Sequence, residues 1–519
     1  MRIGWRWNQV LKSALLLPLV ACSENGGTTE ATAVSGTALE PLPTLTPQLR
    51  TSVLHQYDDA PRTPDADDPA IWVNHRSPAK SLVLGTLKDG GLAVYDLSGA
   101  VVQTVLPPNR PAVSAEDPPV AGSQPDPGTS ACTESESGET FGRFNNVDVV
   151  YDFPLRKAGR VHWVDLAVLT DRGCDRLRSY VIDREASEPL REVTASDAPR
   201  AFPSRFEQPS PVQSPGAPSR VVENPLDDQS TAYGITLTRL DGVRGSVQAF
   251  VTQRSRSTVA QFELYGTPDG HVSYKKTREF RFEPVFRIPA ESRRPRTIAW
   301  TPCREDPSED LQFEGLVVDA ERGILYAAQE VVGLWRIELD RRLPKVVRVP
   351  QSALFEKTKS FGLPYWAVPD GDEFSCESSA PDPLPAGTLA VAGNPAAAGE
   401  YLEADAEGLA IYPVGRKSGY LIASSQGDNT FHVFDRDQVR RHLGAFKVEG
   451  TGDTDGHAVA KQPLGDQFPF GLFVNQNGAA PEPASTDPIN GYEYDGSTQF
   501  EFLGWQDIAA ELGLAIDLE

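Results

Sequence analysis

The sequence predicts an all-β protein, a six-bladed β-propeller whose blades are four-stranded antiparallel sheets around a central channel. Two observations carry this prediction. A short aliphatic pattern recurs six times along the chain, and the patterns that follow it alternate with a period of two. Such alternation is typical of strands, and a spacing of roughly 80 residues is typical of repeated sheets. A helical period occurs only near Asp507 to Leu514.

Each repeat opens with a polar or aromatic residue ahead of a β-branched or aliphatic run. In the first five repeats a second apolar run follows, such as Leu82–Leu84, and then a third, alternating run, such as Leu92–Leu97. The segment Phe500–Trp505 is expected to close the sixth set. The six opening residues are Asp68, Asp148, Tyr233, Glu314, Glu407 and Phe470.

Four of these six opening residues are carboxylates. Equivalent residues of the innermost strands surround the channel of a propeller, so the repeat predicts a ring of acidic side chains. Such a ring repels itself unless cations or bound protons compensate the charge. The alternative is six unrelated strand starts, where Asp is frequent because it forms turns.

The N-terminal segment predicts export and a lipid anchor. Residues 1–21 read as a signal peptide of the lipoprotein type, because a basic start precedes the apolar run Ser13–Ala21, which is too short to span a bilayer. The run ends in Leu-Val-Ala-Cys, the pattern of a bacterial lipobox with Cys22 as the lipidated residue. An ordinary signal peptide with a chance cysteine is the alternative. Ser23 favours the outer membrane of a Gram-negative bacterium.

Residues 22–50 are rich in Thr, Gly, Ala and Pro, which predicts a flexible tether, and 51–519 are predicted to form the propeller. Two further segments, 107–141 and 199–228, are dense in Pro, Ser and acidic residues and are expected to be inserted loops. The formal net charge of −23 repels nucleic acid and anionic lipid, so neither is a predicted partner. A membrane contact is expected only through Cys22, and the protein is expected to be a monomer.

Four cysteines besides Cys22 predict two disulfides in an exported protein. We expect Cys132–Cys174 and Cys303–Cys376, because each pairs an insert or loop with its nearest partner in blade order. No cysteine pair or histidine pair has the spacing of a zinc site, so zinc is not predicted.

Eight short segments follow one another in an order that carries more weight than any one of them. They are Asp67–Trp72, Gly91–Tyr95, Asn145–Leu155, Glu314–Gly315, Asp405–Tyr412, Tyr420–Gly427, Asp453–Gly456 and Phe468–Val474. In this order the segments resemble the β-propeller phytases, a family of calcium-dependent six-bladed enzymes. The resemblance implies several calcium ions at one end of the channel and release of phosphate from myo-inositol hexakisphosphate (phytate), with a preference for the 3-position.

The resemblance also implies roles for individual residues. Those that would bind calcium, directly or through water, are Asp67, Asp68, Asn146, Asp148, Glu314, Glu330, Asp405, Glu407 and Asp455, with Asn477 as a further candidate for a structural ion. Phosphate oxygens would be bound by Lys88, Arg172, Arg254 and Tyr233. Glu314, Glu407 and Asp455 would also take part in catalysis. Calcium suits this set because it prefers many oxygen ligands and because an acidic protein needs cations to bind an anionic substrate.

The sequence departs from the family at three places near these residues. Ser255 follows Arg254 where the family typically has a carboxylate, Gln329 stands where an acid is common, and Cys174 lies beside Arg172. Two alternative functions therefore stay open. One is another calcium-dependent propeller hydrolase, such as a lactonase, and the other is a non-catalytic surface propeller that binds a phosphorylated ligand.

Overall fold

The structure is a computed structural model that describes residues 42–517, without 109–140, 209–219, 225–229 and 240–245 and without the short gaps at 59, 61, 184, 204, 292–293, 307–308, 341 and 372. The predicted signal peptide, Cys22, the tether up to residue 41 and most of the 107–141 insert lie outside the described residues. Among the helices in the described part of the chain, none has the length and apolar character needed to cross a bilayer.

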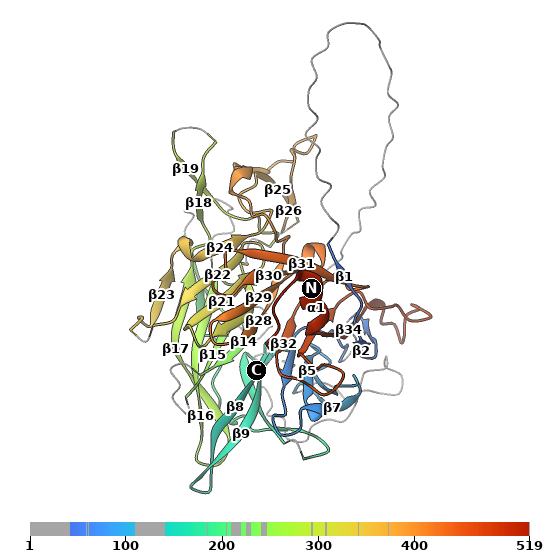
Figure 1. Ribbon diagram of the computed structural model, residues 1–519. Coiled ribbons are helices and arrows are strands. Elements are labelled where there is room, and N and C mark those ends of the chain that lie inside the picture. The colour runs from blue at the N-terminus through green and yellow to red at the C-terminus, as the bar shows by residue number, and fades with distance from the viewer. Residues whose placement is uncertain are drawn as a thin grey trace, which may run out of the picture. The chain divides into compact units, whose positions relative to one another are not determined.

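Six sheets of four or five strands make up most of the described residues (Figure 1). The first three contain β4 (Pro69–Trp72), β5 (Leu82–Thr86), β6 (Leu92–Asp96) and β7 (Val101–Val105); β8 (Phe144–Lys157), β9 (Arg160–Asp171), β10 (Arg176–Ile182) and β11 (Leu190–Glu192); and β14 (Ala232–Thr238), β15 (Val247–Gln253), β16 (Thr258–Gly266), β17 (Val272–Phe282) and β23 (Val346–Val349). The other three contain β20 (Phe313–Asp319), β21 (Ile324–Gln329), β22 (Gly333–Glu338) and β24 (Leu354–Lys357); β28 (Ala406–Val414), β29 (Ser418–Ser425), β30 (Thr430–Asp435), β31 (His442–Val448) and β1 (Thr44–Leu45); and β32 (His457–Ala460), β33 (Leu472–Asn477), β34 (Tyr494–Gly504) and β2 (Leu49–Arg50).

The first strands of these sheets contact one another in cyclic order. β4 contacts β8, β8 contacts β14, β14 contacts β20, β20 contacts β28, β28 contacts β32, and β32 contacts β4. Apolar clusters fill the space between neighbouring sheets, as where Val83 and Tyr95 pack against Phe500 and Phe502. This arrangement confirms the predicted all-β propeller. The predicted helical tail is also present as α1 (Trp505–Leu512), whose Trp505 ring stacks on Tyr412 with centroids 4.0 Å apart.

The N-terminal segment pairs with two of the sheets. β1 adds in parallel to β31, while β2 and β3 (Leu54–Tyr57) both pair antiparallel with β34. Arg50 donates to the fully buried Glu501 across a distance of 2.8 Å. The strands thus begin at Thr44, ahead of the domain start predicted at residue 51. These short strands pair through backbone groups, which any residue type supplies, so the composition of the segment does not reveal them.

Two of the six predicted opening residues differ from the structure. In the second sheet the register of β8 shifts between Phe144 and Val147. Asn145 and Asn146 therefore occupy the bulge at which the other first strands have their opening residue, and Asp148 lies further along the strand. In the sixth sheet the first strand is β32, so Asp455 precedes it, whereas Phe470 lies between β32 and β33. The sixth aliphatic pattern is therefore a second strand. Its likeness to the others comes from a glycine and a following apolar run that both strand types share.

Neighbouring first strands approach closely at glycines. In β14, β20 and β28 the register shift falls at Tyr233-Gly234, Glu314-Gly315 and Glu407-Gly408. A Cβ atom on Gly234 would lie 1.9 Å from the carbonyl oxygen of Glu314, and one on Gly315 would lie 2.1 Å from that of Glu407. The backbone of each opening residue therefore lies against the glycine of the neighbouring, preceding sheet. This contact places the opening side chains at the same end of the ring.

We expect Gly315→Ala to destabilise the protein by more than about 2 kcal/mol, because the new methyl group would overlap backbone atoms that cannot move independently. Gly159→Ala is the matched control. Gly159 has a φ of 73°, and a Cβ atom added there would meet none of the described atoms within 4 Å. Gly159→Ala should therefore lower the free energy of unfolding only through the strain of alanine in a left-handed backbone conformation, by about 1 kcal/mol. Urea unfolding of the two variants measures the difference. Equal losses would contradict the close approach at Gly315.

Candidate active site

Three glutamates form the centre of the candidate site. Glu314 and Glu407 open β20 and β28, and Glu330 directly follows β21. One carboxylate oxygen from each of the three lies within 4.8 Å of the others. All three side chains are nearly buried, with exposed fractions of 5%, 4% and 9%. Within the described residues, Glu330 Oε1 and Glu407 Oε2 are buried without a hydrogen-bond partner. Buried carboxylate oxygens of this kind are costly unless a proton or cation binds them.

The pKa values of these carboxyls reflect the same cost. Burial, and then repulsion from Asp67, raises the pKa of Glu314 to about 7. Burial followed by the charges of Asp405 and Glu314 raises the pKa of Glu330 well above its usual range. The pKa of Glu407 is likewise raised well above normal, by burial and then by Glu330 and Glu314. The folded chain therefore holds several carboxyls that cannot all be charged without a compensating cation.

Lys88 lies between acidic residues of the first and last sheets. Its ammonium nitrogen is 2.8 Å from Asp65 Oδ2, 3.2 Å from Asp67 Oδ1 and 3.9 Å from Asp455 Oδ2. Burial lowers the pKa of Lys88, but these three carboxylates more than offset that effect and raise it, so the lysine keeps its charge. Asp67 Oδ2 is buried and has no partner within the described residues. The sequence predicted Lys88, Asp67 and Asp455 for the site but not Asp65.

Arg172 is joined to the glutamate centre through Asn145. The guanidinium Nη1 donates to Asn145 Oδ1 at 2.9 Å, and Asn145 Nδ2 donates to Glu314 Oε1 at 2.9 Å and to Asn146 Oδ1 at 2.7 Å. The guanidinium carbon also lies 5.6 Å from the centre of the Tyr233 ring, and Tyr233 hydrogen-bonds to Glu314. Asn145 is thus a site residue that was not among those predicted, although it lies in one of the segments that resemble the family.

Arg254 approaches the glutamates from the third sheet, and its charge lowers the pKa of Glu330 against the larger effect of burial. The neighbouring Ser255 is hydrogen-bonded to the segment 309–312, which precedes β20 and contains no predicted site residue. Its hydroxyl donates to Glu309 Oε1 at 2.7 Å and its backbone N–H donates to Gln312 Oε1 at 2.9 Å. Gln312 Nε2 then donates to Glu330 Oε2 at 2.8 Å. The Glu309 carboxylate therefore lies beside Ser255, the position at which the resemblance leads one to expect a carboxylate.

Two acidic residues complete this end of the ring. Burial and then the charge of Glu305 raise the pKa of Asp405 to about 6. Asp68 accepts from the Val147 backbone N–H at 3.1 Å, and burial is the largest of the causes that raise its pKa well above normal. Gln426 donates to Asp455 Oδ1 at 2.6 Å through its side chain and to the Asp405 carbonyl at 2.9 Å through its backbone.

The structure places Asp148, Asn477 and Gln329 in other surroundings. Asp148 accepts from the backbone N–H groups of Val149 and Leu237, both at 2.6 Å, so it joins β8 to β14. Asn477 accepts from Gly452 and Ala479 N–H and donates to Gly450 and Glu501, well supplied with protein partners. Gln329 donates to the Leu311 carbonyl and accepts from the Trp335 indole. These three side chains have structural partners and do not join the glutamate centre.

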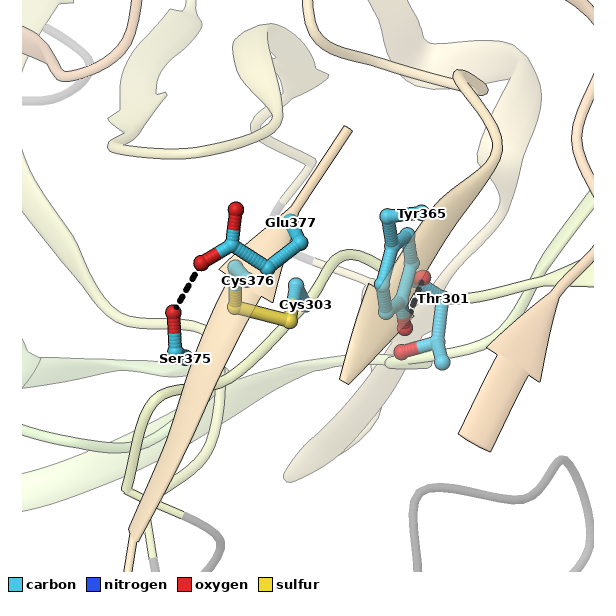
Figure 2. Close-up of a disulfide and its surroundings, with 6 residues drawn as sticks. All are labelled: Thr301, Cys303, Tyr365, Ser375, Cys376 and Glu377. Carbon is cyan, nitrogen blue, oxygen red and sulfur yellow. Dashed lines mark hydrogen bonds between the residues drawn. A yellow bond between two sulfur atoms is a disulfide. The ribbon is translucent and has the colours of Figure 1, made fainter. Parts of the chain in front are cut away.

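A disulfide fixes the segment that carries Glu305, Glu309 and Gln312. Cys303 is bonded to Cys376 on β26 (Glu373–Glu377), part of a small sheet with β25 (Tyr365–Asp370) and β27 (Leu389–Val391). Figure 2 shows this bond beside the Tyr365 hydroxyl, which donates to the Thr301 carbonyl at 3.0 Å. The prediction of Cys303–Cys376 is confirmed. Cys174 is also disulfide-bonded, and its predicted partner Cys132 lies outside the described residues.

Comparison with known proteins gives three kinds of match. A family model described as Phytase matches residues 16–105 and 385–519. The chain is 27% identical over 482 residues to a protein of Bacillus subtilis (strain 168) named 3-phytase, with 91% of this chain and 87% of that protein covered. Two solved structures, a Pseudomonas aeruginosa periplasmic gluconolactonase and the Dos1 propeller, are 12% and 9% identical, cover 74% and 87% of this chain and 70% and 82% of their own, and have TM-scores of 0.31 each.

The fold, the acidic centre and the sequence matches together define a β-propeller hydrolase. The family-model match and the Bacillus subtilis relative support a β-propeller phytase assignment for this chain. The two structural likenesses are too weak to add to this assignment.

Proposed function

We propose that this protein is a calcium-dependent phosphomonoesterase that releases phosphate from phytate. One observation carries the proposal: Glu314, Glu330 and Glu407 meet at one end of the ring, next to the cations Lys88 and Arg172. Carboxylates alone would repel a phosphate ester, and cationic side chains alone would not need so many buried acids. The two kinds of group together suit a phosphate that is bound through both metal ions and protein cations.

The residues present fit calcium. Hard oxygen donors predominate, and three of them, on Asp67, Glu330 and Glu407, are buried without a hydrogen-bond partner among the described residues. A cation would remove the repulsion that raises the pKa values of these carboxyls. We propose as ligands Asp67, Asp68, Asn146, Glu314, Glu330, Asp405, Glu407 and Asp455. Bound calcium would supply positive charge that offsets the carboxylates and attracts phosphate oxygens.

The protein's own side chains would orient the phosphate. Lys88, Arg172 and Arg254 lie on three neighbouring sheets, so they can contact different oxygens of one phosphate group. The Tyr233 hydroxyl, which burial keeps protonated by raising its pKa, could donate its single proton to a further phosphate oxygen in place of Glu314. Asn145 holds Arg172 and Glu314 at hydrogen-bond distance, and this fixed geometry lowers the entropy cost of reaching the transition state.

A phosphate-release assay on calcium phytate, with and without a chelator, tests the proposal. We expect release in calcium and none after chelation, with activity restored by added calcium. Release that survives the chelator would contradict the calcium site. Absence of release under every condition would favour a non-catalytic phosphate binder, and turnover of a lactone in its place would favour the lactonase alternative.

We further propose that the first phosphate removed is at the 3-position, as the name of the Bacillus subtilis relative suggests. Analysis of the first inositol pentakisphosphate product by chromatography tests this independently of the activity itself. For location we propose export, with lipid attachment at Cys22 in the outer membrane. Membrane fractionation of the natural protein and of Cys22→Ser tests the anchor.

Lys88→Ala should raise KM for calcium phytate and also lower kcat. Lys88 would contact a phosphate oxygen in both the ground state and the transition state, so part of its effect is uniform binding. Lys88→Arg is the matched variant and should recover part of the lost affinity, since it keeps the charge beside Asp65 and Asp67. Steady-state kinetics measures both constants. An unchanged KM in Lys88→Ala would contradict the assignment.

A further inference from the structure

The β8–β9 hairpin extends beyond its own sheet (Figure 1). β10 pairs with β9 only between Asp165 and Asp171, whereas β8 and β9 continue to pair through residues 153–157 and 160–164. We call residues 153–164 the arm. The arm is only two strands wide; its backbone at Pro154 and Arg156 lies against Gly266 and the Lys157 side chain against Gly270, while residues 156–163 remain exposed.

The end of the arm exposes apolar side chains. Residues 156–163 are all exposed, and Val161 and Trp163 keep 49% and 43% of their surface in water. Phe153 and Leu155, at the base of the same arm, are buried. The buried side chains of the base therefore belong to the core between sheets. Trp163, which pairs with Pro154 near the base, and Val161, which pairs with Arg156 nearer the turn, face water and contribute little to that core. Exposed groups of this kind on one projecting element indicate a contact surface.

The arm also has a charge opposite to that of the protein. Arg156, Lys157 and Arg160 lie at its tip, and residues 153–164 contain no acidic residue. Within the described part of the chain, none of these three cations takes part in an ion pair. The full chain has a net charge of −23. Three clustered cations on an acidic protein therefore point to an anionic partner.

We infer that the arm binds an anionic lipid surface. Basic residues that flank an exposed tryptophan are typical of protein segments at the membrane–water interface, where the cations contact headgroups and the ring lies at their level. The overall negative charge does not prevent this. β8 starts at the carboxylate site and ends at the tip, so Asn146 and Lys157 are separated by about 35 Å of strand. That length exceeds several Debye lengths at physiological ionic strength.

Binding through the arm would also orient the propeller on the membrane. Because β8 begins at the candidate active site and runs away from it to the tip, a membrane bound at the tip would leave the site facing the surrounding solution. A highly charged substrate could then reach the carboxylate end without approaching the anionic surface.

The test uses the full-length chain with Cys22→Ser, so that no attached lipid contributes, and measures its partition onto vesicles. We expect binding to vesicles of phosphatidylglycerol and phosphatidylcholine, and much weaker binding to phosphatidylcholine alone. The variant Arg156→Ala/Lys157→Ala/Arg160→Ala should lose on the order of a hundredfold in partition at low salt. Trp163→Phe should lose the quenching of tryptophan fluorescence by bromolipids.

The control variant Arg342→Ala/Lys345→Ala/Arg348→Ala removes the same charge from an exposed segment elsewhere and should bind as the parent does. Circular dichroism confirms that each variant is folded. The inference is overturned if the arm variant binds anionic vesicles as well as the parent, or if the control loses as much. Tight binding to polyglutamate without binding to anionic vesicles would also overturn it, in favour of an acidic polymer.

Discussion

Glu407→Gln should lower kcat for calcium phytate by about 10²- to 10³-fold while the protein stays folded. Glu407 opens β28, one of its carboxylate oxygens is within 4.8 Å of oxygens of Glu314 and Glu330, and its Oε2 has no partner within the described residues. Glutamine keeps the shape and removes the charge that a cation would bind. Steady-state phosphate release measures the effect.

Glu501→Gln is the matched control for this variant. Glu501 is also fully buried, but its partners lie away from the glutamate centre: Arg50 in the N-terminal segment, Thr451 between β31 and β32, and Asn475 and Asn477 on β33. Its loss should lower stability and leave turnover close to normal. Near-normal turnover in a folded Glu407→Gln protein would show that the glutamate centre is not the catalytic one.

Calcium should raise the thermal midpoint by several degrees as well as activate the enzyme. Calcium should bind only the folded protein, because the carboxylates that would hold it come from separate sheets. A hundredfold excess of calcium over its Kd would then add about 2.7 kcal/mol to the free energy of unfolding. Differential scanning calorimetry in calcium and in chelator measures the shift. Magnesium should replace calcium poorly, since it favours a smaller octahedral site.

The same experiment on Glu330→Gln provides a test of location. Glu330 contributes one of the unpartnered oxygens, so its removal should reduce the calcium-dependent part of the midpoint shift. Equal midpoints with and without calcium in the parent protein would contradict metal binding at this ring. If the midpoint shift in Glu330→Gln is as large as in the parent, the calcium that stabilises the protein binds at another site.

Much of the fold was predictable because it depends on patterns that alternate in sequence. The second and third strands of the first five sheets fall where the apolar runs predicted them, as with β5 and β6. The errors concern the first strands. β32 is only four residues long and begins with His457, so it carries no recognisable aliphatic run, and the bulge of β8 at Asn145 cannot be seen from alternation.

The sequence predicts those site residues that open a strand of the repeat. It does not predict those that join the site only through contacts between distant segments. Glu314 and Glu407 follow from the repeat. Asn145, Gln312 and Glu309 do not, because their roles depend on hydrogen bonds to Arg172, Glu330 and Ser255 that only the folded chain creates. Gln312 lies in a segment held by the Cys303–Cys376 bond, which no local pattern connects to the glutamates.

The pairing of β2 and β3 with β34 determines when folding can finish. Residues near the start of the chain complete a sheet whose other strands come from residues 457–504, so that sheet has no stable form during most of synthesis. Closing this contact spans nearly the whole sequence, which makes it a slow step that comes late in folding. A chain that ends before Tyr494 would leave Leu49–Arg50 and Leu54–Tyr57 without a partner strand. The protein should therefore tolerate shortened surface loops far better than the loss of its final strand.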